Sequence, residues 1–282
     1  MLRPLLFLTL LFLLVIYWSR PDNSGNKNTP PPSAPSPKKP PPAPSKPGRT
    51  VAVGDLHSDL PQTLAVLRLA NVIDEDANWS GGQDTLVQTG DIVDRGPDTI
   101  AVYNLFDKLR NQAKEVGGKV VNVYGNHEVM NLGEDLRYVT EEDYESFGGR
   151  EKRRQAWNVR TGWLGKMIFK NFNITHIQNG HTIFTHGPIW SRSNAMQDGG
   201  AEETCRRVNA AKKALGVNRL ISGHTPQYRT GKILSICNGG YMVIDVGISK
   251  YYGGHLAVLE ILENDDGTQN VFALYPGGKR RL

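Results

Sequence analysis

Gly54-Asp-Leu-His-Ser-Asp59 is the first of six polar loops, each of which follows a short run rich in β-branched residues. Gly90-Asp-Ile-Val-Asp-Arg-Gly96 and Gly125-Asn-His-Glu128 are the next two, and shorter loops begin at His186, Gly223 and Asp245. Runs of this kind that end at glycine-containing loops are typical of β-strands. The predicted strands are Thr50–Val53, Thr85–Gln88, Lys119–Val123, Thr182–Thr185, Arg219–Ser222 and Tyr241–Ile244.

Helix-like stretches separate several of these strands, notably Leu60–Asn71 and Asp98–Lys114. Alternation of strand, loop and helix predicts an α/β fold. In such sheets, the loops that leave the carboxyl ends of the strands line one edge and build the functional site. Two later runs, His255–Ile261 and Asn270–Tyr275, alternate in polarity and are predicted to be further strands, antiparallel to their neighbours.

The side chains in these loops suit metal binding. Carboxylates, imidazoles and a side-chain amide bind Mn, Fe or Zn without thiolates. Asp55 and His57 are close enough in sequence to bind one ion, and Asp91 could bridge it to a second. Two ions about 3.5–4 Å apart can share a hydroxide that attacks phosphorus in line. The predicted metal ligands are Asp55, His57, Asp91, Asn126, His186 and His224.

Further polar residues beside these ligands predict acid catalysis and phosphate binding. His127 follows Asn126 directly and is placed to protonate a leaving alkoxide, while Asp94 would hold its other ring nitrogen. Arg95 offers a planar fork to phosphoryl oxygens, and Arg192 is predicted to be a second such clamp. Asn126 is assigned to the substrate phosphate as well as to the metal.

Several other conspicuous residues are predicted to have structural roles. Glu128 is expected to cap or pair locally rather than to react. Trp190 and Tyr252 are expected to pack in the core. The three histidines without a loop context, His176, His181 and His255, are expected to be structural.

Charge and cysteine content narrow the classes of function. The net charge of +5 comes from residues 1–50, which contain seven basic residues and one acidic residue. Residues 51–282 then hold 26 basic and 27 acidic residues, so the basic surface expected of a nucleic-acid-binding domain is missing. Only Cys205 and Cys237 are present, which excludes a thiolate metal site and leaves one disulfide or two reduced thiols as alternatives.

The amino-terminal segment predicts membrane attachment. Leu5–Trp18 is apolar except for Thr9, and at fourteen residues it is shorter than the roughly 20 of a spanning helix. No small residues form a cleavage site after it, and Tyr17 and Trp18 resemble interfacial anchors. We therefore predict an uncleaved signal anchor at 1–20, with the rest of the chain in the secretory lumen or outside the cell. A cleaved, secreted form and a cytosolic domain remain alternatives.

The remainder of the chain divides by composition. Residues 21–49 are rich in proline, serine and lysine and predict a disordered stalk. Residues 50–276 are predicted to form the catalytic domain, within which the polar segment 129–180 is a cap-like insertion containing helices. Residues 277–282 are predicted to be a basic tail. The sequons at Asn78 and Asn173 are compatible with a luminal domain. The sequence leaves the oligomeric state open.

The order of the motifs, D-x-H, GD, GNH, H and GH, resembles the calcineurin-like metallophosphoesterase superfamily over residues 50–276. GDIVDRG and GNHE are similar to the phosphoprotein phosphatase branch. The resemblance implies a β-sandwich flanked by helices and two metal ions. It also implies the roles given above for the six ligands, for His127 with Asp94, and for Arg95.

Departures from that branch point to a subgroup. Ser58 stands where the branch commonly has glycine, and the SAPNY motif of the eukaryotic serine/threonine enzymes is missing. DLRYV, HGPIWSR and GHTPQ are similar instead to the Shewanella-like phosphatases, and the assignment of Arg192 rests on this similarity. The resemblance implies a phosphatase acting on phosphorylated serine or threonine in proteins, with tyrosine as an alternative.

Two other functions remain open. Hydrolases of small phosphoesters or dinucleoside polyphosphates carry the same motifs. A membrane-tethered interaction protein would retain the fold without the metals, and the intact ligand set argues against it.

Overall fold

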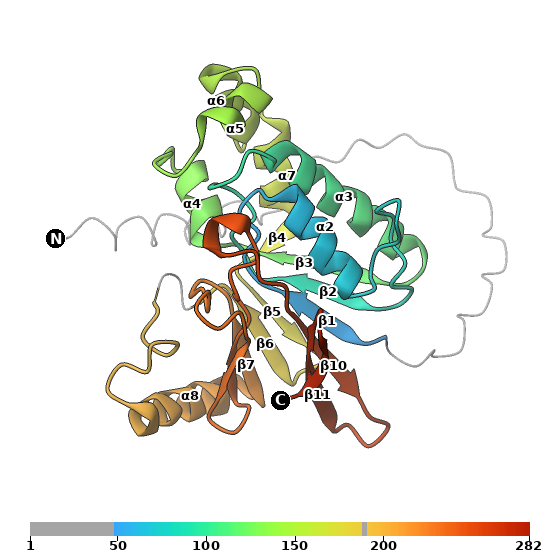
Figure 1. The fold of residues 1–282 in the computed structure, drawn as a ribbon, viewed down its shortest axis with the longest axis vertical. Coiled ribbons are helices and arrows are strands. Elements are labelled where there is room, and N and C mark those ends of the chain that lie inside the picture. Colours follow the sequence, from blue (N-terminus) through green and yellow to red (C-terminus); the bar gives the residue numbers. More distant parts are fainter. Residues whose placement is uncertain (1–47, 188–190) are drawn as a thin grey trace, which may run out of the picture. The chain divides into compact units, whose positions relative to one another are not determined.

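The computed structural model describes residues 48–187 and 191–282 (Figure 1). The predicted signal anchor (1–20) and nearly all of the predicted stalk (21–49) lie outside these residues, so both remain predictions. No helix in the described part of the chain is both long enough and apolar enough to cross a membrane.

The first sheet has seven strands in the order β12-β11-β10-β1-β2-β3-β4. The strands β1 to β4 run parallel, and β10 pairs antiparallel with the free side of β1 (Thr50 opposite Ile261). The bounds are β1 Thr50–Val53, β2 Thr85–Gln88, β3 Lys119–Val123, β4 Phe172–Asn173, β10 Val258–Glu263, β11 Gln269–Tyr275 and β12 Gly278–Arg281.

The second sheet has five strands in the order β5-β6-β7-β9-β8, of which β6, β7 and β9 run parallel. The bounds are β5 Thr175–Gln178, β6 Thr182–Thr185, β7 Arg219–Ser222, β8 Leu234–Ile236 and β9 Tyr241–Val243. The six strands predicted before polar loops therefore divide equally between the two sheets. The α/β class is confirmed, as is the sandwich that the family resemblance implied.

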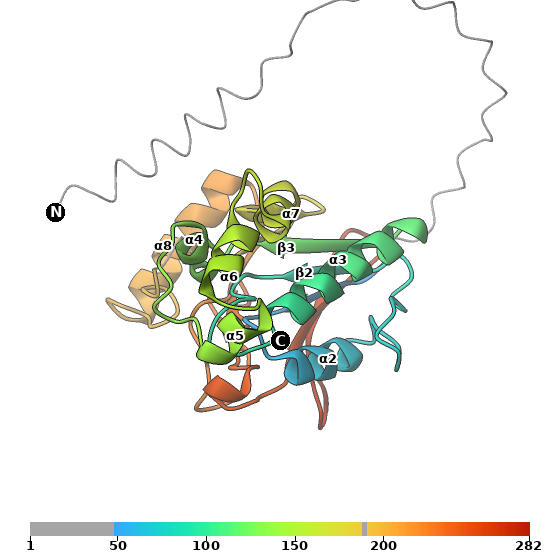
Figure 2. The same ribbon diagram turned by 90° about the horizontal axis from the view of Figure 1, so that it is seen from above.

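Helices cover the outer faces of the sandwich. The helices α2 (Leu60–Leu69) and α3 (Thr99–Glu115) lie together on the first sheet (Figures 1 and 2). The buried side chains of α3 recur at helical spacing, at Val102, Phe106, Leu109 and Ala113. The helix α8 (Ala201–Leu215) packs on the second sheet through Val208.

One apolar core joins the two sheets. It includes Val51 and Val87 of the first sheet together with Phe184, Ile221 and Met242 of the second. Burial of such side chains stabilises the fold by about 25 cal/mol per Å² of apolar surface. The core holds the two sheets so that the carboxyl ends of their parallel strands meet.

The predicted insertion, 129–180, contains most of α4 (Asn126–Leu132) and all of α5 (Glu141–Ser146), α6 (Arg150–Trp157) and α7 (Trp163–Asn171). Helices were expected here, one of them over residues 135–147, of which α5 covers only Glu141–Ser146. The insertion is also more than a cap, because it ends by supplying the edge strands β4 and β5 of the two sheets.

The carboxyl-terminal residues differ from the prediction of a basic tail. Gly278–Arg281 form β12, which pairs antiparallel with β11. Lys279 of β12 forms an ion pair with Glu260 of β10, so part of the basic charge in this segment is neutralised within the sheet.

A disulfide joins Cys205 of α8 to Cys237, which follows β8. Of the two alternatives that the sequence left open, the structure has the bridge. It ties α8 to the β8–β9 hairpin on the edge of the second sheet.

Candidate active site

The polar loops of both sheets converge at the carboxyl ends of the parallel strands, and all the predicted ligands except Asn126 are buried there. Glycines before the ligands make this approach possible. A Cβ on Gly125 would lie 2.1 Å from Oδ1 of Asp91, and one on Gly223 would lie 2.4 Å from Oδ1 of Asp55. The glycine of each motif is therefore required because a neighbouring loop passes against it.

Two groups of metal-binding side chains meet at Asp91. Donor atoms of His57, Asp91 and His127 lie within 4.8 Å of one another, and so do those of Asp91, His186 and His224. Asp91 belongs to both groups.

The second group is closely packed around one ring nitrogen. Nε2 of His186 lies 3.1 Å from Oδ2 of Asp91, 3.1 Å from Oδ1 of Asn126 and 3.2 Å from Nδ1 of His224. The other nitrogen, Nδ1, donates to the carbonyl of Thr89 at 2.8 Å. That bond orients the ring so that Nε2 faces the other ligands, as in metal-binding histidines generally.

His57 is held in the same manner in the first group. Its Nδ1 donates to the carbonyl of Val93 at 3.2 Å. Burial lowers the pKa of His57 to about 3, so the ring is neutral, the form in which imidazole binds metals. Asp55 lies nearer the second group, because its carboxylate accepts the backbone N–H of His224 and approaches Nδ1 of His186 to 3.9 Å.

Three buried carboxylates, Asp55, Asp91 and Asp245, lie in this centre. Burial raises the pKa of Asp55 well above its usual range, and the charges of Asp245 and Asp91 raise it further. Burial also raises the pKa of Asp245 to about 7. Ionising several buried carboxylates close together is costly. A divalent cation bound among them would stabilise their ionised forms. Oxygen and imidazole donors suit Mn, Fe or Zn.

His127 lies at the rim of this centre with its predicted partner. Oδ2 of Asp94 accepts a hydrogen bond from Nδ1 of His127 at 2.6 Å, and Oδ1 accepts one from Asn131 at 3.0 Å. The Nε2 atom of His127 lies 3.8 Å from Oδ2 of Asp91. Burial alone lowers the pKa of His127, but the hydrogen bond to Asp94 and the charges of Asp91 and Asp94 outweigh it, so the pKa is raised.

Glu128 caps α4 locally through Gly125, as expected, and also binds groups distant in the sequence. Its Oε2 accepts the N–H groups of Asp91 (2.9 Å) and Gly125 (2.8 Å). Its Oε1 accepts the N–H of Ile92 (2.8 Å) and the hydroxyl of Tyr103 (2.9 Å). One buried carboxylate thus joins the loops after β2 and β3.

Both predicted phosphate-binding arginines lie beside the centre. The guanidinium of Arg95 stacks between Tyr138 (3.9 Å to the ring centroid) and Tyr251 (4.8 Å), and its Nη1 donates to the Tyr251 hydroxyl. Arg192 donates from Nε to the carbonyl of His224 at 3.2 Å. A pocket of about 440 Å³ opens next to Arg95 and is lined in part by Lys250 and Tyr251.

The sequence profile of calcineurin-like phosphoesterases matches residues 48–228, which include strands of both sheets. The chain belongs to this family. It is a metal-dependent phosphatase, and its site contains the family's metal-binding residue types. An uncharacterized protein of Schizosaccharomyces pombe is 35% identical over 273 residues, which cover 80% of each chain.

Shewanella-like phosphatases are also similar to this phosphatase. Shewanella-like protein phosphatase 1 of Plasmodium berghei is 27% identical over 249 residues, covering 72% of this chain and 68% of that protein. The solved cold-active protein-tyrosine phosphatase of a Shewanella species superposes with a TM-score of 0.66 at 23% identity. That match covers 83% of this chain and 80% of the other, and shows a shared fold. The resemblance drawn from the motifs is confirmed.

The structure adds residues to the site of this phosphatase that sequence reasoning missed or misplaced. Tyr252, expected in the core, is half-buried with its ring 5.1 Å from that of His57, so it lines the site. Asp245 directly follows the sixth predicted strand. This position, shared with the predicted ligands, could have identified it as a site residue. Tyr138 and Asn131 lie in the insertion. Tyr138 belongs to the DLRYV segment that carried the subgroup similarity, whereas nothing in the sequence marked Asn131. Trp190 lies outside the described residues.

Left-handed backbone is concentrated at the site of this phosphatase. Asp91, Asp94 and Arg95 have φ of 55°, 73° and 71°, and His57 and His224 have φ of 49° and 69°. Such conformations are costly for residues other than glycine and persist where surrounding contacts enforce them. This backbone geometry lets consecutive side chains contact different groups. Asp94 binds His127, while Arg95 stacks on Tyr138 and Tyr251.

Proposed function

We propose that this phosphatase binds two divalent cations and hydrolyses phosphomonoesters on protein side chains, whether serine, threonine or tyrosine. The observation that carries the proposal is Asp91, whose carboxylate is common to both groups of metal-binding side chains. A carboxylate between two such groups, buried and with histidines on either side, is suited to hold two ions close together.

The ligands would divide around Asp91. Asp55 and His57 would complete the first ion's set, as the D-x-H motif predicts, and Asn126, His186 and His224 would complete the second. Asp55 also contacts the second set, through His224 and His186. The donor types are compatible with Mn, Fe or Zn. When bound, the cations would lower the pKa of water and neutralise phosphoryl charge.

The remaining chemistry belongs to side chains of the protein. Arg95, Asn126 and Arg192 would hold the phosphoryl oxygens, and the tyrosines on either side of Arg95 keep its fork in place. His127 would give a proton from Nε2 to the leaving oxygen. The hydrogen bond from its Nδ1 to Asp94 fixes the ring and supports the charged form.

A protein substrate is favoured by the relatives' names and by the surroundings of Arg95. Two relatives, of Arabidopsis thaliana and Plasmodium berghei, are named as protein phosphatases. The pocket of about 440 Å³ beside Arg95 lies next to Lys250 and Tyr251 and offers room for groups flanking the phosphorylated residue.

The proposal is tested by metal analysis of the purified protein and by turnover of a panel of substrates. The panel contains phosphoserine, phosphothreonine and phosphotyrosine peptides, p-nitrophenyl phosphate and diadenosine tetraphosphate. We expect two metal ions per chain and the fastest turnover with a phosphopeptide. One ion per chain would refute the dinuclear site, and preference for the dinucleotide would refute the protein substrate.

We also propose that the catalytic domain lies in the secretory lumen or outside the cell, held by the amino-terminal segment. The Cys205–Cys237 disulfide supports this, because such bridges persist in oxidising compartments. Asn173 of one sequon is exposed. Digestion of the domain by protease added to sealed microsomes would refute the luminal location.

A further inference from the structure

A buried arginine of the insertion lies against the carboxylate that orients His127. Arg153 of α6 is 1% exposed, and its Nε donates to Asp143 of α5 at 2.7 Å. Its Nη2 lies 3.9 Å from Oδ1 of Asp94 and makes no hydrogen bond with any described residue. The rings of Tyr144, Phe147 and Trp157 surround the guanidinium at 5.2–5.6 Å.

Stability gives little reason for a charged side chain at this position. Replacing a buried ion pair by apolar residues of similar volume is often neutral or stabilising. The aromatic surroundings of Arg153 would accept such a replacement. A role other than the ion pair with Asp143 would explain why a charged side chain occupies this position. The other carboxylate close to the Arg153 guanidinium is Asp94.

The Oδ1 atom of Asp94, which does not bind His127, is contacted by Asn131 and Arg153. Oδ2 of Asp94 accepts from His127 and Oδ1 accepts from Asn131, and the carboxylate is fully buried. Asp143, also fully buried, lies on the far side of Arg153. Without the guanidinium, the two carboxylates would lose the cation that lies between them, and the orientation of Asp94 would depend on neutral contacts and the imidazole alone.

We propose that Arg153 is a positioning residue of the hydrolytic reaction, which holds the Asp94 carboxylate in line with Nδ1 of His127. This inference rests on the proposed function, in which His127 protonates the leaving group. The insertion, through Arg153 of α6, would then help to orient the general acid His127. The chain of contacts runs from Asp143 through Arg153 and Asp94 to His127.

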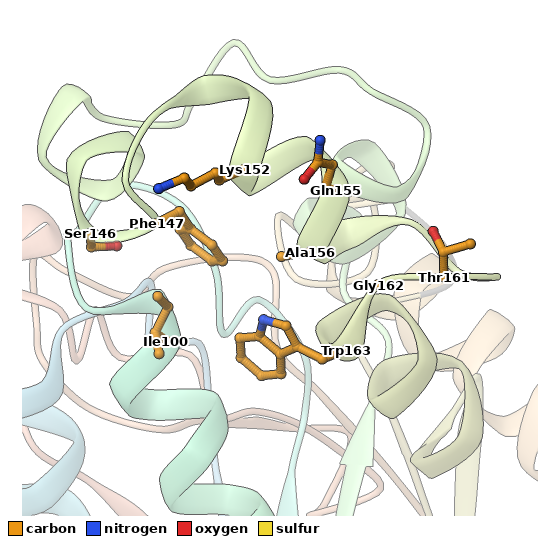
Figure 3. A pocket seen from close by; sticks show the side chains of 9 residues that line it. All are labelled: Ile100, Ser146, Phe147, Lys152, Gln155, Ala156, Thr161, Gly162 and Trp163. Atoms are coloured by element: carbon orange, nitrogen blue, oxygen red, sulfur yellow. The ribbon is translucent and has the colours of Figure 1, made fainter.

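The residue before Arg153 in α6 supplies a control. Lys152, Gln155 and Ala156 line a pocket of about 460 Å³ between α5, α6, α7 and the start of α3 (Figure 3). Lys152 is a cation next to Arg153 in sequence, but its side chain extends along this pocket. Lys152→Ala therefore perturbs the same helix without touching Asp94.

The test compares aryl phosphates whose leaving groups differ in their need for a proton. Loss of general-acid catalysis costs about 10²–10⁴-fold where the leaving group is poor. We expect Arg153→Met to lower turnover of phenyl phosphate on the order of 10²-fold. Turnover of 2,4-dinitrophenyl phosphate, whose leaving group needs no proton, should change far less. Lys152→Ala should leave both rates unchanged.

A double variant separates positioning from folding. Asp143→Asn with Arg153→Met removes the buried pair together, so thermal stability should return toward wild type. If Arg153 positions Asp94, phenyl phosphate turnover stays low in this variant. Recovery of both stability and turnover would overturn the inference. The double variant also carries the test if Arg153→Met alone does not fold.

His127→Ala distinguishes failure of this inference from failure of the proposed function. We expect it to discriminate between the two aryl phosphates as Arg153→Met does. Equal losses for both substrates in His127→Ala would remove His127 as the acid. Discrimination by His127→Ala but not by the Arg153 variants would leave the proposed function intact and overturn the role of Arg153.

Discussion

Glu128→Gln is expected to destabilise the protein by about 2–4 kcal/mol, although it changes a single atom. The carboxylate accepts four hydrogen bonds, two at each oxygen. Glutamine keeps one acceptor oxygen. Its amide NH₂ replaces the other oxygen and faces the two donors that this oxygen had accepted from. If the oxygen stays with Asp91 and Gly125, the N–H of Ile92 faces another donor, while the Tyr103 hydroxyl can rotate to accept.

The magnitude follows from these four bonds. A buried N–H left without an acceptor costs about 1–3 kcal/mol, and each of the two retained bonds loses roughly 1 kcal/mol when its acceptor becomes neutral. Burial raises the pKa of Glu128, and the charge of Asp91 adds to this, so loss of the negative charge offsets part of the cost. The balance is about 2–4 kcal/mol.

Urea denaturation of the metal-free protein, followed by tryptophan fluorescence, measures this effect. Glu145→Gln on α5 makes the same chemical change at an exposed position and should alter the unfolding free energy by less than about 0.5 kcal/mol. Metal content should also fall in Glu128→Gln, because the Asp91 and Asn126 loops lose their common anchor. A difference under about 1 kcal/mol with full metal content would refute this account of Glu128.

Three further predictions concern metals, pH and the disulfide. Asp91→Asn should lose both ions' occupancy and nearly all turnover, and normal stoichiometry measured by mass spectrometry would contradict its shared position. Burial raises the pKa of Asp245 to about 7 from 3.8, so the metal-free folded state should lose stability as the pH rises from 4 to 7. This loss should be smaller in Asp245→Asn, and equal pH profiles for the two proteins would rule out the contribution of Asp245. Cys205→Ser with Cys237→Ser opens a loop of 32 residues and should cost about 3–4 kcal/mol in urea denaturation, whereas an unchanged midpoint would show that the bridge adds nothing.

Much of the fold could be predicted because its strands are short, β-branched and marked by glycine. Five of the six strands before polar loops have the predicted bounds, and β9 ends one residue earlier, at Val243. Their division into two sheets could not be predicted from the runs themselves, because local patterns do not determine which strands pair. The edge strands β4 and β5 were missed because they are short and partly exposed.

The residues of the site also divide into those that the sequence could identify and those that it could not. Residues in the strand-end loops could be found because the fold brings strand ends together whatever the sequence separation. Arg153 could not be found, since it reaches Asp94 from a helical insertion whose charged composition is that of an ordinary solvated surface. Tyr138 lies in the DLRYV segment, but that similarity did not show that its ring would contact Arg95. The buried arginine has the same sequence signal as its exposed neighbour Arg154.

The antiparallel pairing of β1 with β10 has a consequence for how the protein is made. Ala52 lies opposite Leu259, so the outer edge of β1 stays uncovered during synthesis until β10 has been made. Contacts between such distant residues form slowly, because a long loop must close first. Chain ends that stop before Val258 would leave β1 exposed as a free edge, ready to pair with another chain. We expect the first sheet to be completed only after β10 has left the ribosome, and chains terminated before that point to be substrates for chaperones and proteases rather than partly active enzymes.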